Sequence, residues 1–508
     1  MKRLGLALTC SLIALAATAP GASAQSHGGV ADIATIGEPP TLDAMVSATD
    51  IVGTITQHIF ETLYTFDADW KVAPLLAVDL PEISEDGTVY TIALRQGITF
   101  HDGSAMTSSD VLASLTRWTE VASRGKQAAA AIEAIEAIDD FTIRITLTRP
   151  YAPLLSLLAF NNAAAIIIPE EDVAVPLEKV TGTGPYKLQE HLPDQYIQLV
   201  RFDDYSSRSE DPSKFAGARH AYLDEIRFLP VPDANTRVEA SVAGEYDYVD
   251  SLPVEAYPRL EQGKSEALLL QHFGWPIFVM NTKEGVLADP MARKAVQAAL
   301  DTSDMLIAAF GDTQFYSVDG PLYPEGYVWR SEVGIESYNV GDPEAAGEFL
   351  AQSEYDGQPL RILTSQQYPF HYKMAQVAQA YLELAGFKVD MQVVEWATLV
   401  QRNKKPELWD VFITHSPFLP EPSLNFIFSP TAGGWWDTPE KAAALLAFDA
   451  ALTTEERVEK FADLQALYFE QAPVIKIGDF SALSSKSKSL GGFEPSPWPA
   501  FWNAYITE

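Results

Sequence analysis

The sequence predicts an α/β protein with mixed β-sheets, and two observations lead to that prediction. The first is a strand, helix and strand in succession: Leu360 to Thr364 is strand-like, residues 370–385 are helical in pattern, and alternate residues over 387–393 are apolar. Gly386 stands where a left-handed residue commonly follows a helix. The succession is a βαβ unit, which places two parallel strands in one sheet.

The second observation is that helices and strands alternate elsewhere in the chain. A helix predicted over 234–243 ends at Gly244-Glu245 and precedes an alternating run over 246–249. Asp342 and Pro343 are typical of the N-cap and first position of a helix, which continues here to Leu350. Such alternation is typical of α/β architecture.

Two glycine-containing turns separate predicted elements in the first half of the chain. Residues 88–94 form a period-2 strand, and the Asp102-Gly103 turn precedes a Ser/Asp-rich helix start near Asp110. In the turn from Gly182 to Pro185 we expect the glycines to adopt positive φ and Pro185 to begin a strand. This second turn lacks the GK[ST] ending of a phosphate-binding loop.

The amino terminus predicts export. Lys2 and Arg3 precede an apolar run over 4–17, and Ala22-Ser23-Ala24 is a small-residue cleavage signal, so we expect residues 1–24 to be a secretory signal. The run is short for a bilayer span. The single cysteine, Cys10, lies within it and follows Thr9, which disfavours a lipid anchor there. The processed chain then has no disulfide and no thiolate metal site.

Composition limits the classes of function. The 508 residues are 47% hydrophobic and 20% charged, which indicates a folded protein of two or three domains, and the net charge is −34. That charge argues against nucleic acid or anionic membrane as a partner and mildly favours cationic or zwitterionic ligands. The chain has no G-x-S-x-G, H-E-x-x-H or Walker motif, so a binding protein is favoured and an exported hydrolase is a remote alternative.

Several short motifs occur in a fixed order along the chain. They are EPPTLD at 38–43, IFETLYTFDADWKVAPLLA at 59–77, LRQGITFHDGS at 94–104, GTGPYKL at 182–188, IFVMNT at 277–282 and DPMARKAVQAALD at 289–301. Each is weak alone, but together they resemble the extracellular solute-binding proteins of family 5, which serve ABC importers of peptides, nickel and opines. In that family the stretch at 59–77 matches the opening helix and the strand after it.

The resemblance implies a periplasmic-binding-protein fold of type II, with two lobes, a hinge and an extra inserted domain. Lobe I then comprises residues 25–67, 181–271 and 480–508, the inserted domain 68–180, and lobe II 272–479. The chain crosses between lobes near Gln271-His272 and Gly478-Asp479. A periplasmic monomer of this kind buries a small solute between its lobes, and the closed form is presented to the permease subunits in the inner membrane.

The resemblance also identifies a departure from the peptide-binding members. Those members carry an Asp that pairs with the α-ammonium of the peptide, and the matching stretch here is HSPFLPEP at 415–422, which puts Phe418 at the Asp position. An aromatic ring offers a cation–π face but no ion pair. Ordinary peptides with a free amino terminus are therefore in doubt, unless Glu421 substitutes, although its family counterpart usually fixes the loop.

Other candidate ligand-binding residues are aromatic or basic. Trp435 and Trp436 follow Gly433-Gly434, and Trp275 follows the first crossing; for all three, ligand stacking and core packing stay open. Further candidates are Phe370 and His371 at a strand-to-helix turn, Arg124 beside Gly125 in a break between helices, and Arg402. A surface role is the favoured alternative for His371, and a solvated loop for Arg124.

The ligand class stays open at this point. A peptide or amino-acid-derived solute is favoured, while a nickel chelate held with the help of His415 and a sugar or opine conjugate are alternatives. No resident metal or cofactor is predicted.

Overall fold

The computed structural model describes residues 27–429 and 432–507, so the predicted secretory signal lies outside the described residues. The largest sheet has twelve strands, and its main path runs β15-β14-β16-β12-β18-β11-β1-β10-β9-β8, with β13 and β17 paired at its side. The bounds are β1 Val30–Thr35, β8 Tyr186–Leu192, β9 Tyr196–Arg201, β10 Glu225–Pro230, β11 Tyr248–Leu252, β12 Glu266–Met280, β13 Tyr316–Ser317, β14 Pro359–Thr364, β15 Lys388–Val393, β16 Val411–Pro417, β17 Val474–Lys476 and β18 Asp479–Lys486.

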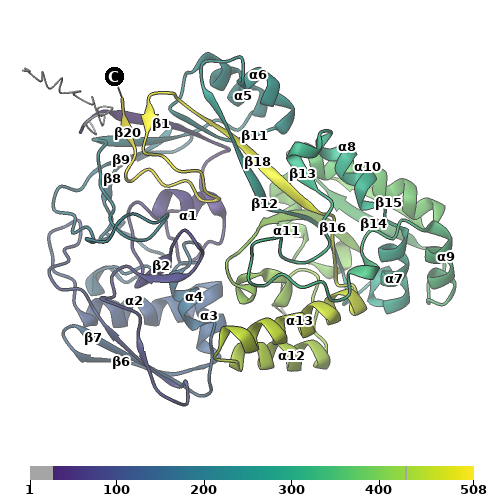
Figure 1. The fold of residues 1–508 in the computed structure, drawn as a ribbon, viewed down its shortest axis with the longest axis horizontal. Coiled ribbons are helices and arrows are strands. Elements are labelled where there is room, and N and C mark those ends of the chain that lie inside the picture. The colour runs from purple at the N-terminus through teal and green to yellow at the C-terminus, as the bar shows by residue number, and fades with distance from the viewer. Residues whose placement is uncertain (1–26, 430–431, 508) are drawn as a thin grey trace, which may run out of the picture.

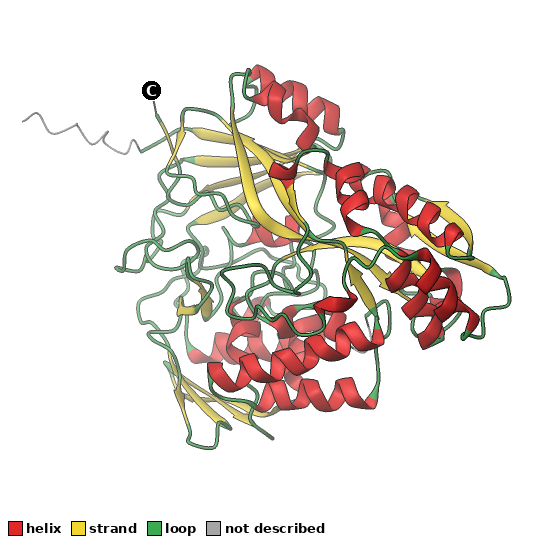
Figure 2. Ribbon diagram, turned by 45° about the vertical axis from the view of Figure 1, so that its right-hand side comes forward, coloured by secondary structure: helices red, strands yellow, loops and turns green. Residues whose placement is uncertain are grey.

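The main sheet is mixed, as predicted. Strand β1 pairs in parallel with β10 and β11, and β14 pairs in parallel with β15 and β16, whereas the other pairs are antiparallel. Strands β1 and β8–β11 fall in the segments assigned above to lobe I, and β14–β16 fall in lobe II. Figure 2 shows the strands as a continuous band between the two halves of the molecule.

Two strands join the halves of this sheet. Strand β12 pairs with β18 from Glu266 to Gly274 and with β16 from Gly274 to Met280, so one continuous strand belongs to both halves. The pairing register shifts between Leu270 and Gly274, where His272 has φ +48°. Figure 1 shows β12 and β18 crossing side by side between the lobes. The predicted crossing at Gln271-His272 therefore falls inside an irregular part of a long strand.

The segment 68–180 carries a sheet of its own and shares a core with lobe I. Its four strands are ordered β4-β5-β7-β6, and a short hairpin of β2 and β3 precedes them. Ile33 of lobe I, Trp118 and Ile145 belong to one continuous cluster of buried side chains. The bounds are β2 Tyr64–Phe66, β3 Val72–Pro74, β4 Glu82–Ile83, β5 Val89–Ala93, β6 Ile132–Asp139 and β7 Thr142–Leu147; a last hairpin pairs β19 Leu490–Gly491 with β20 Tyr505–Ile506.

Helices lie outside the sheets, and α12 and α13 of lobe II lie close to α3 and α4 of the inserted domain (Figure 1). The helices are α1 Asp50–Thr56, α2 Ser108–Val121, α3 Ser123–Ala129, α4 Leu154–Ala159, α5 Ala234–Ala243, α6 Tyr257–Leu260, α7 Pro290–Ala299, α8 Thr302–Phe310, α9 Pro343–Ala351, α10 Pro369–Leu384, α11 Trp396–Arg402, α12 Pro439–Ala450 and α13 Thr454–Gln471. Single 3₁₀ turns occur at Glu170–Asp172, Val254–Ala256, Val286–Ala288, Thr313–Phe315, Ile335–Ser337, Pro406–Leu408, Pro422–Leu424 and Phe426–Phe428.

The elements predicted from local signals are confirmed. The βαβ unit is β14, α10 and β15, and Gly386 has φ +102°. The predicted helix at 234–243 is α5, which ends at the left-handed Gly244. Asp342 accepts hydrogen bonds from the first backbone N–H groups of α9, and Thr107 forms a capping box with Asp110 at the start of α2.

Three local expectations are wrong. The opening helix is α1 and ends at Thr56, ahead of the 59–77 motif, and the strand after Gly244 begins only at Tyr248. Gly182 and Gly184 do not have positive φ. They are needed because a Cβ would lie 2.1 Å from the carbonyl oxygen of Ile59 at Gly182 and 2.5 Å from that of His58 at Gly184. The backbone after α1 packs directly against this turn.

This close approach makes Gly184 sensitive to substitution. We expect Gly184→Ala to lower the free energy of unfolding by about 1 to 3 kcal/mol, because its methyl group forces the backbone at His58 to move. Gly37→Ala is the control, since its Cβ meets nothing within 4 Å, and it should change stability by less than about 0.5 kcal/mol. Urea unfolding measures both, and equal effects would contradict the packing argument.

Candidate functional site

Two carboxylates of lobe I influence the pKa of a tyrosine of lobe II. Asp50 is the first residue of α1, Asp250 lies on β11, and Tyr368 is the N-cap of α10. Burial is the main reason that the pKa of Tyr368 is raised to about 12, and the charges of Asp50 and Asp250 add to the increase, while Arg237 opposes it. Charges from one lobe therefore act directly on a side chain of the other.

Both carboxyl groups are desolvated. Burial raises the pKa of Asp50, and the charge of Asp250 adds to the increase, while a hydrogen bond of 2.7 Å from Trp498 Nε1 opposes it. The side chain of Asp50 is nevertheless exposed. Burial likewise raises the pKa of Asp250, against the effect of the Arg237 guanidinium.

Arg237 of α5 completes the charged groups on the lobe I side. Its guanidinium donates to the carbonyl oxygens of Val231 and Ser251, at 2.7 and 3.0 Å. Burial lowers its pKa, and Asp250 and Tyr368 oppose that decrease. The charge of Asp250 therefore acts on Arg237, Asp50 and Tyr368 alike.

The lobe II side carries a cluster of aromatic and imidazole rings. The ring of Tyr368 lies 4.8 Å from that of His415 and 5.0 Å from that of Trp396, and the ring of Phe370 lies 5.3 Å from those of His415 and of Phe480, the first lobe I residue after the second crossing. Phe370, His371 and His415, which the sequence selected separately, therefore meet in one cluster. We call Asp50, Asp250, Arg237, Tyr368 and His415 the interlobe site.

His371 corrects the surface role favoured from the sequence. It lies within α10, its side chain is fully buried, and its Nε2 lies 3.0 Å from Nδ1 of His415. Burial lowers the pKa of His371 well below its usual value and that of His415 to about 4. Both imidazoles are neutral near pH 7.

The sequence favoured a solvated loop for Arg124, and the structure corrects this. Arg124 belongs to helix α3 and is buried, with its guanidinium 4.5 Å from the centre of the Phe160 ring. It donates to Asn162 and, at 3.1 Å, to the carbonyl oxygen of Leu424 in lobe II. Burial lowers its pKa to about 10. Its contact joins the inserted domain to lobe II.

A second side chain makes the same connection. Gln127, also on α3, donates to the carbonyl oxygen of Ser423 at 2.9 Å, and the backbone N–H of Ala152 donates to the carbonyl oxygen of Asp449 at 2.8 Å. The lobes are therefore in contact at the edge away from the crossing strands.

Phe418 lies in the core of lobe II. It is 2% exposed, its ring stacks on Trp275 at 6.5 Å, and the Lys476 ammonium lies 5.3 Å from its centre. Trp275 is equally covered, at 1% exposed. Core packing accounts for both rings, so the expected cation–π face of Phe418 is not offered to a solute. Glu421 is held by two hydrogen bonds from Arg457, at 2.7 and 2.8 Å, as a residue that fixes its loop.

Trp435, Trp436 and Arg402 lie away from the interlobe site. Trp435 stacks on Trp409 at 5.5 Å, near the end of β12 farthest from the crossing, and Trp436 is 3% exposed and donates to Gln471. Arg402 ends α11, and its carbonyl oxygen accepts a hydrogen bond from Trp409. These three residues are part of the packing of lobe II and its surface.

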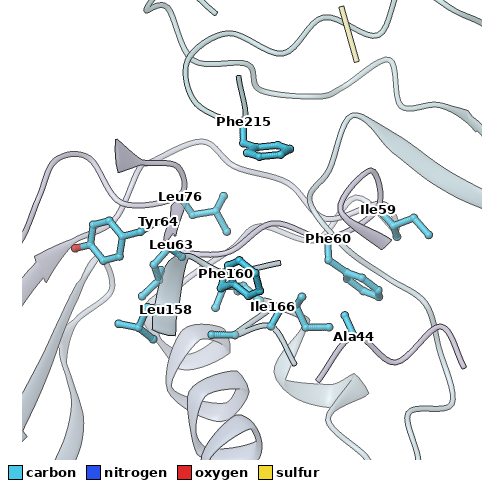
Figure 3. Close-up of a cluster of buried hydrophobic side chains, with 14 of the residues drawn as sticks. Ala44, Ile59, Phe60, Leu63, Tyr64, Leu76, Leu158, Phe160, Ile166 and Phe215 are labelled. Carbon is cyan, nitrogen blue, oxygen red and sulfur yellow. The ribbon is translucent and has the colours of Figure 1, made fainter. Parts of the chain in front are cut away.

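A small crevice between lobe I and the inserted domain adjoins Asp50 through Trp498. Its walls are aromatic and include Phe60, Phe66, Trp70, Phe160, Phe215 and Trp498. Figure 3 shows Phe215 on the side opposite Phe60 and Phe160. The crevice offers an apolar neighbour to the carboxylate of Asp50.

Sequence reasoning missed Asp50, Asp250, Arg237 and Tyr368. An Asp in the first turn of a helix is ordinarily explained by the helix dipole, and this chain has 69 acidic residues. Tyr368 adjoins Phe370 and His371, and this proximity is the signal in the sequence that could have identified it. Within the described ranges no helix is long and apolar enough to span a membrane, and no group of three or more His, Cys, Asp or Glu is arranged to hold a metal.

Two lobes joined by paired strands, with charged groups and rings between them, define a solute-binding protein of the periplasmic type. The model of the bacterial extracellular solute-binding proteins, family 5 Middle, matches residues 71–435. The chain belongs to this family, whose members are the solute-binding components of ABC transporters.

Similar proteins agree with this assignment. A probable peptide ABC transporter periplasmic-binding protein, y4tO of Sinorhizobium fredii, is 27% identical over 91% of this chain and 90% of its own length. The glutathione-binding protein GsiB of Pectobacterium atrosepticum is 27% identical over 92% of each chain. The first of these relatives is named as a peptide transporter's periplasmic-binding protein, and the second is named as a glutathione-binding protein.

Solved structures show the same fold. DppA of Helicobacter pylori, in complex with the peptide STSA, has a TM-score of 0.83 at 22% identity and covers 95% of this chain and 99% of its own. AgaA of A. tumefaciens R10, in complex with agropinic acid, has a TM-score of 0.80 at 25% identity, with 94% and 99% covered. The periplasmic-binding-protein fold predicted from the sequence is confirmed.

The contact between the inserted domain and lobe II contains a titrating carboxyl group. Burial raises the pKa of Asp449 to about 7, against a hydrogen bond from Ser423. The pKa of Asp449 in the folded protein lies above its value in the unfolded chain, so ionisation of this carboxyl group destabilises the fold. The contribution of Asp449 to the free energy of unfolding therefore decreases as pH rises from about 4 to 7. We expect Asp449→Asn to be more stable than the wild type at pH 8, by at most about 4 kcal/mol, and equally stable at pH 4.

Urea unfolding of both proteins across that pH range measures the difference. Asp463→Asn, an exposed position on α13, is the control and should follow the wild-type pH profile. Parallel profiles for wild type and Asp449→Asn would contradict the assignment.

Proposed function

We propose that the protein captures a peptide or amino-acid-derived solute between lobe I and lobe II and delivers it to its permease, with a cationic group of the solute between Asp50 and Asp250. The observation that carries the proposal is the pair of desolvated carboxylates that influence the pKa of Tyr368 across the lobes. A buried carboxylate is stabilised by a positive partner, and an ammonium group supplies one.

In this chain the negative charge that pairs with the ammonium comes from residues other than the one at the family's Asp position. Phe418 occupies the family's Asp position but is covered by Trp275, Tyr323 and Tyr327. Asp50 and Asp250 provide negative charge from the opposite lobe instead. A solute with a free amino group is thus compatible with this chain, in contrast to the doubt raised from Phe418 alone.

The named ligands of similar proteins support the same solute class. One relative is named for peptides and another for glutathione, and the two solved structures hold a peptide and agropinic acid. We further propose that β12 and β18 form the hinge, that the lobes are divided at the predicted boundaries, and that the protein acts as a periplasmic monomer without enzymatic activity.

The identity of the solute is tested by native mass spectrometry of freshly purified protein. A peptide or amino-acid-derived compound retained at one copy per chain is the expected result. A panel of amino acids, short peptides and glutathione is then screened by thermal shift, because a solute that binds only the folded state raises the melting temperature. A retained sugar without an amino group, or chemical turnover of any bound solute, would contradict the proposal.

The role of the carboxylates is tested by Asp250→Asn. We expect the affinity for the identified solute to fall at least about 30-fold, because the variant removes one partner of a buried charge pair. The solute-free variant should melt at a higher temperature than the wild type, because a desolvated charge is lost. Glu245→Gln, exposed in the same lobe, is the control. Unchanged affinity, or equal binding of the N-acetylated solute to the wild type, would refute the ammonium assignment.

A further inference from the structure

The contact between His371 and His415 contains a single hydrogen between two nitrogens. His371 Nε2 and His415 Nδ1 lie 3.0 Å apart, a hydrogen-bond distance, so one nitrogen carries a proton and the other a lone pair. His371 is fully buried on α10, whereas His415 on β16 is half-buried beside Tyr368. The direction of this hydrogen bond decides whether Nε2 of His415, the ring nitrogen away from His371, carries a proton or a lone pair.

Each direction fixes both tautomers, because a neutral imidazole carries one proton. If His371 donates from Nε2, its Nδ1 is a bare lone pair, and His415 must carry its own proton on Nε2. If His415 donates from Nδ1, its Nε2 is a lone pair, and His371 must carry its proton on Nδ1. The first arrangement gives His415 a donor toward the interlobe site, and the second gives it an acceptor or metal ligand.

The surroundings of His371 favour the first arrangement. Its Nδ1 is buried and has no hydrogen-bond partner among the described residues, so a proton placed there would be an orphaned donor. His371 is the third residue of α10, and the positive end of the helix favours a lone pair over an N–H near that backbone. The rings around it, Tyr368, Phe370 and Trp396, offer no carboxylate or carbonyl acceptor.

His415 is free to act on its other side. No described residue bonds its Nε2, and its side chain is only partly covered. The groups near Tyr368, which contacts His415, are Asp50, Asp250 and Arg237 of lobe I. Tyr368 links the two sets of groups, since its ring contacts His415 and its pKa responds to the two carboxylates.

We propose that His371 holds His415 in the Nε2–H tautomer, so that His415 donates a hydrogen bond to an acceptor oxygen of the solute and does not ligate a metal. His371 is a positioning residue, because it acts through His415. The part that concerns solute rests on the proposed function, since it requires a solute in the interlobe site. Together the two lobes then select an amino-acid-derived solute that has a cationic group for lobe I and a carboxylate or carbonyl oxygen for lobe II.

The tautomer is measured directly by ¹⁵N NMR on solute-free protein with ¹⁵N-labelled histidine at pH 7. The chain has eight histidines, and the His415→Gln spectrum assigns the signals of His415 by their loss. We expect Nδ1 of His415 at the shift of a bare nitrogen and Nε2 at that of a protonated one. The reverse pattern, or a doubly protonated ring, would overturn the inference, and neither result depends on knowing the solute.

Two variants at position 371 separate positioning from packing. The amide of His371→Gln can still donate to His415 Nδ1, so it should keep the tautomer and bind the solute found by mass spectrometry within about threefold of wild type. His371→Phe fills the space without a donor and should mix the tautomers and lower affinity at least tenfold. If His371→Phe fails to fold, the wild-type spectrum with His371→Gln decides the question. Equal affinity of wild type and a folded His371→Phe would overturn the inference while the proposed function stands.

Nickel ion alone provides the last test. Stoichiometric Ni²⁺ should leave the His415 signals of the wild type unbroadened, because coordination at Nε2 requires the His415 proton to move to Nδ1 and the His371 proton to move to its buried, unpartnered Nδ1. Selective broadening of His415 at one equivalent would show that the pair changes tautomer and would refute the exclusion of metal ligation. If no solute of any class binds, the proposed function fails, whereas the spectrum still decides the tautomer.

Discussion

The antiparallel pair of β12 and β18 is the constraint on which the rest of the structure depends. Both strands belong to the two halves of the main sheet, so their register sets how the lobes face each other. At the start of β18, Asp479 lies 2.7 Å from the Lys476 ammonium, and both side chains are buried. A buried charge without its partner is costly, so this ion pair fixes where β18 begins. The positions of Asp250 and His415 follow from that register.

Local elements could be predicted from the sequence because their causes are local. The cap at Asp342 and the left-handed Gly244 act on residues within one turn, and both were found where the sequence placed them. The pairing of β1 with β10 joins segments almost 200 residues apart, and only the family resemblance indicated it. The turn at Gly182 shows the limit of local reasoning, since its glycines are required by a distant backbone and not by their own φ.

The candidate site was harder to predict because the same residue types serve cores and ligands. Phe418 and Trp436 were selected as bulky residues in irregular segments, yet other rings cover them. Asp50 was one acidic residue among many, and only its desolvation between the lobes distinguishes it. His371 and His415 are 44 residues apart and lie on different elements, and no sequence signal indicates that they share a hydrogen bond. Environment, rather than residue identity, defines this site.

The hydrogen bonds from Arg124 and Gln127 to lobe II have a consequence for transport. Both donors bind main-chain oxygens and not cargo, so with the proposed hinge at β12 and β18 these bonds stabilise the closed form whether or not solute is bound. A receptor closed in this way populates a shut but empty state, which competes with the loaded one for the transporter. Weakening the bonds would shift the empty receptor toward the open form, so that docking to the transporter would depend more strongly on bound solute.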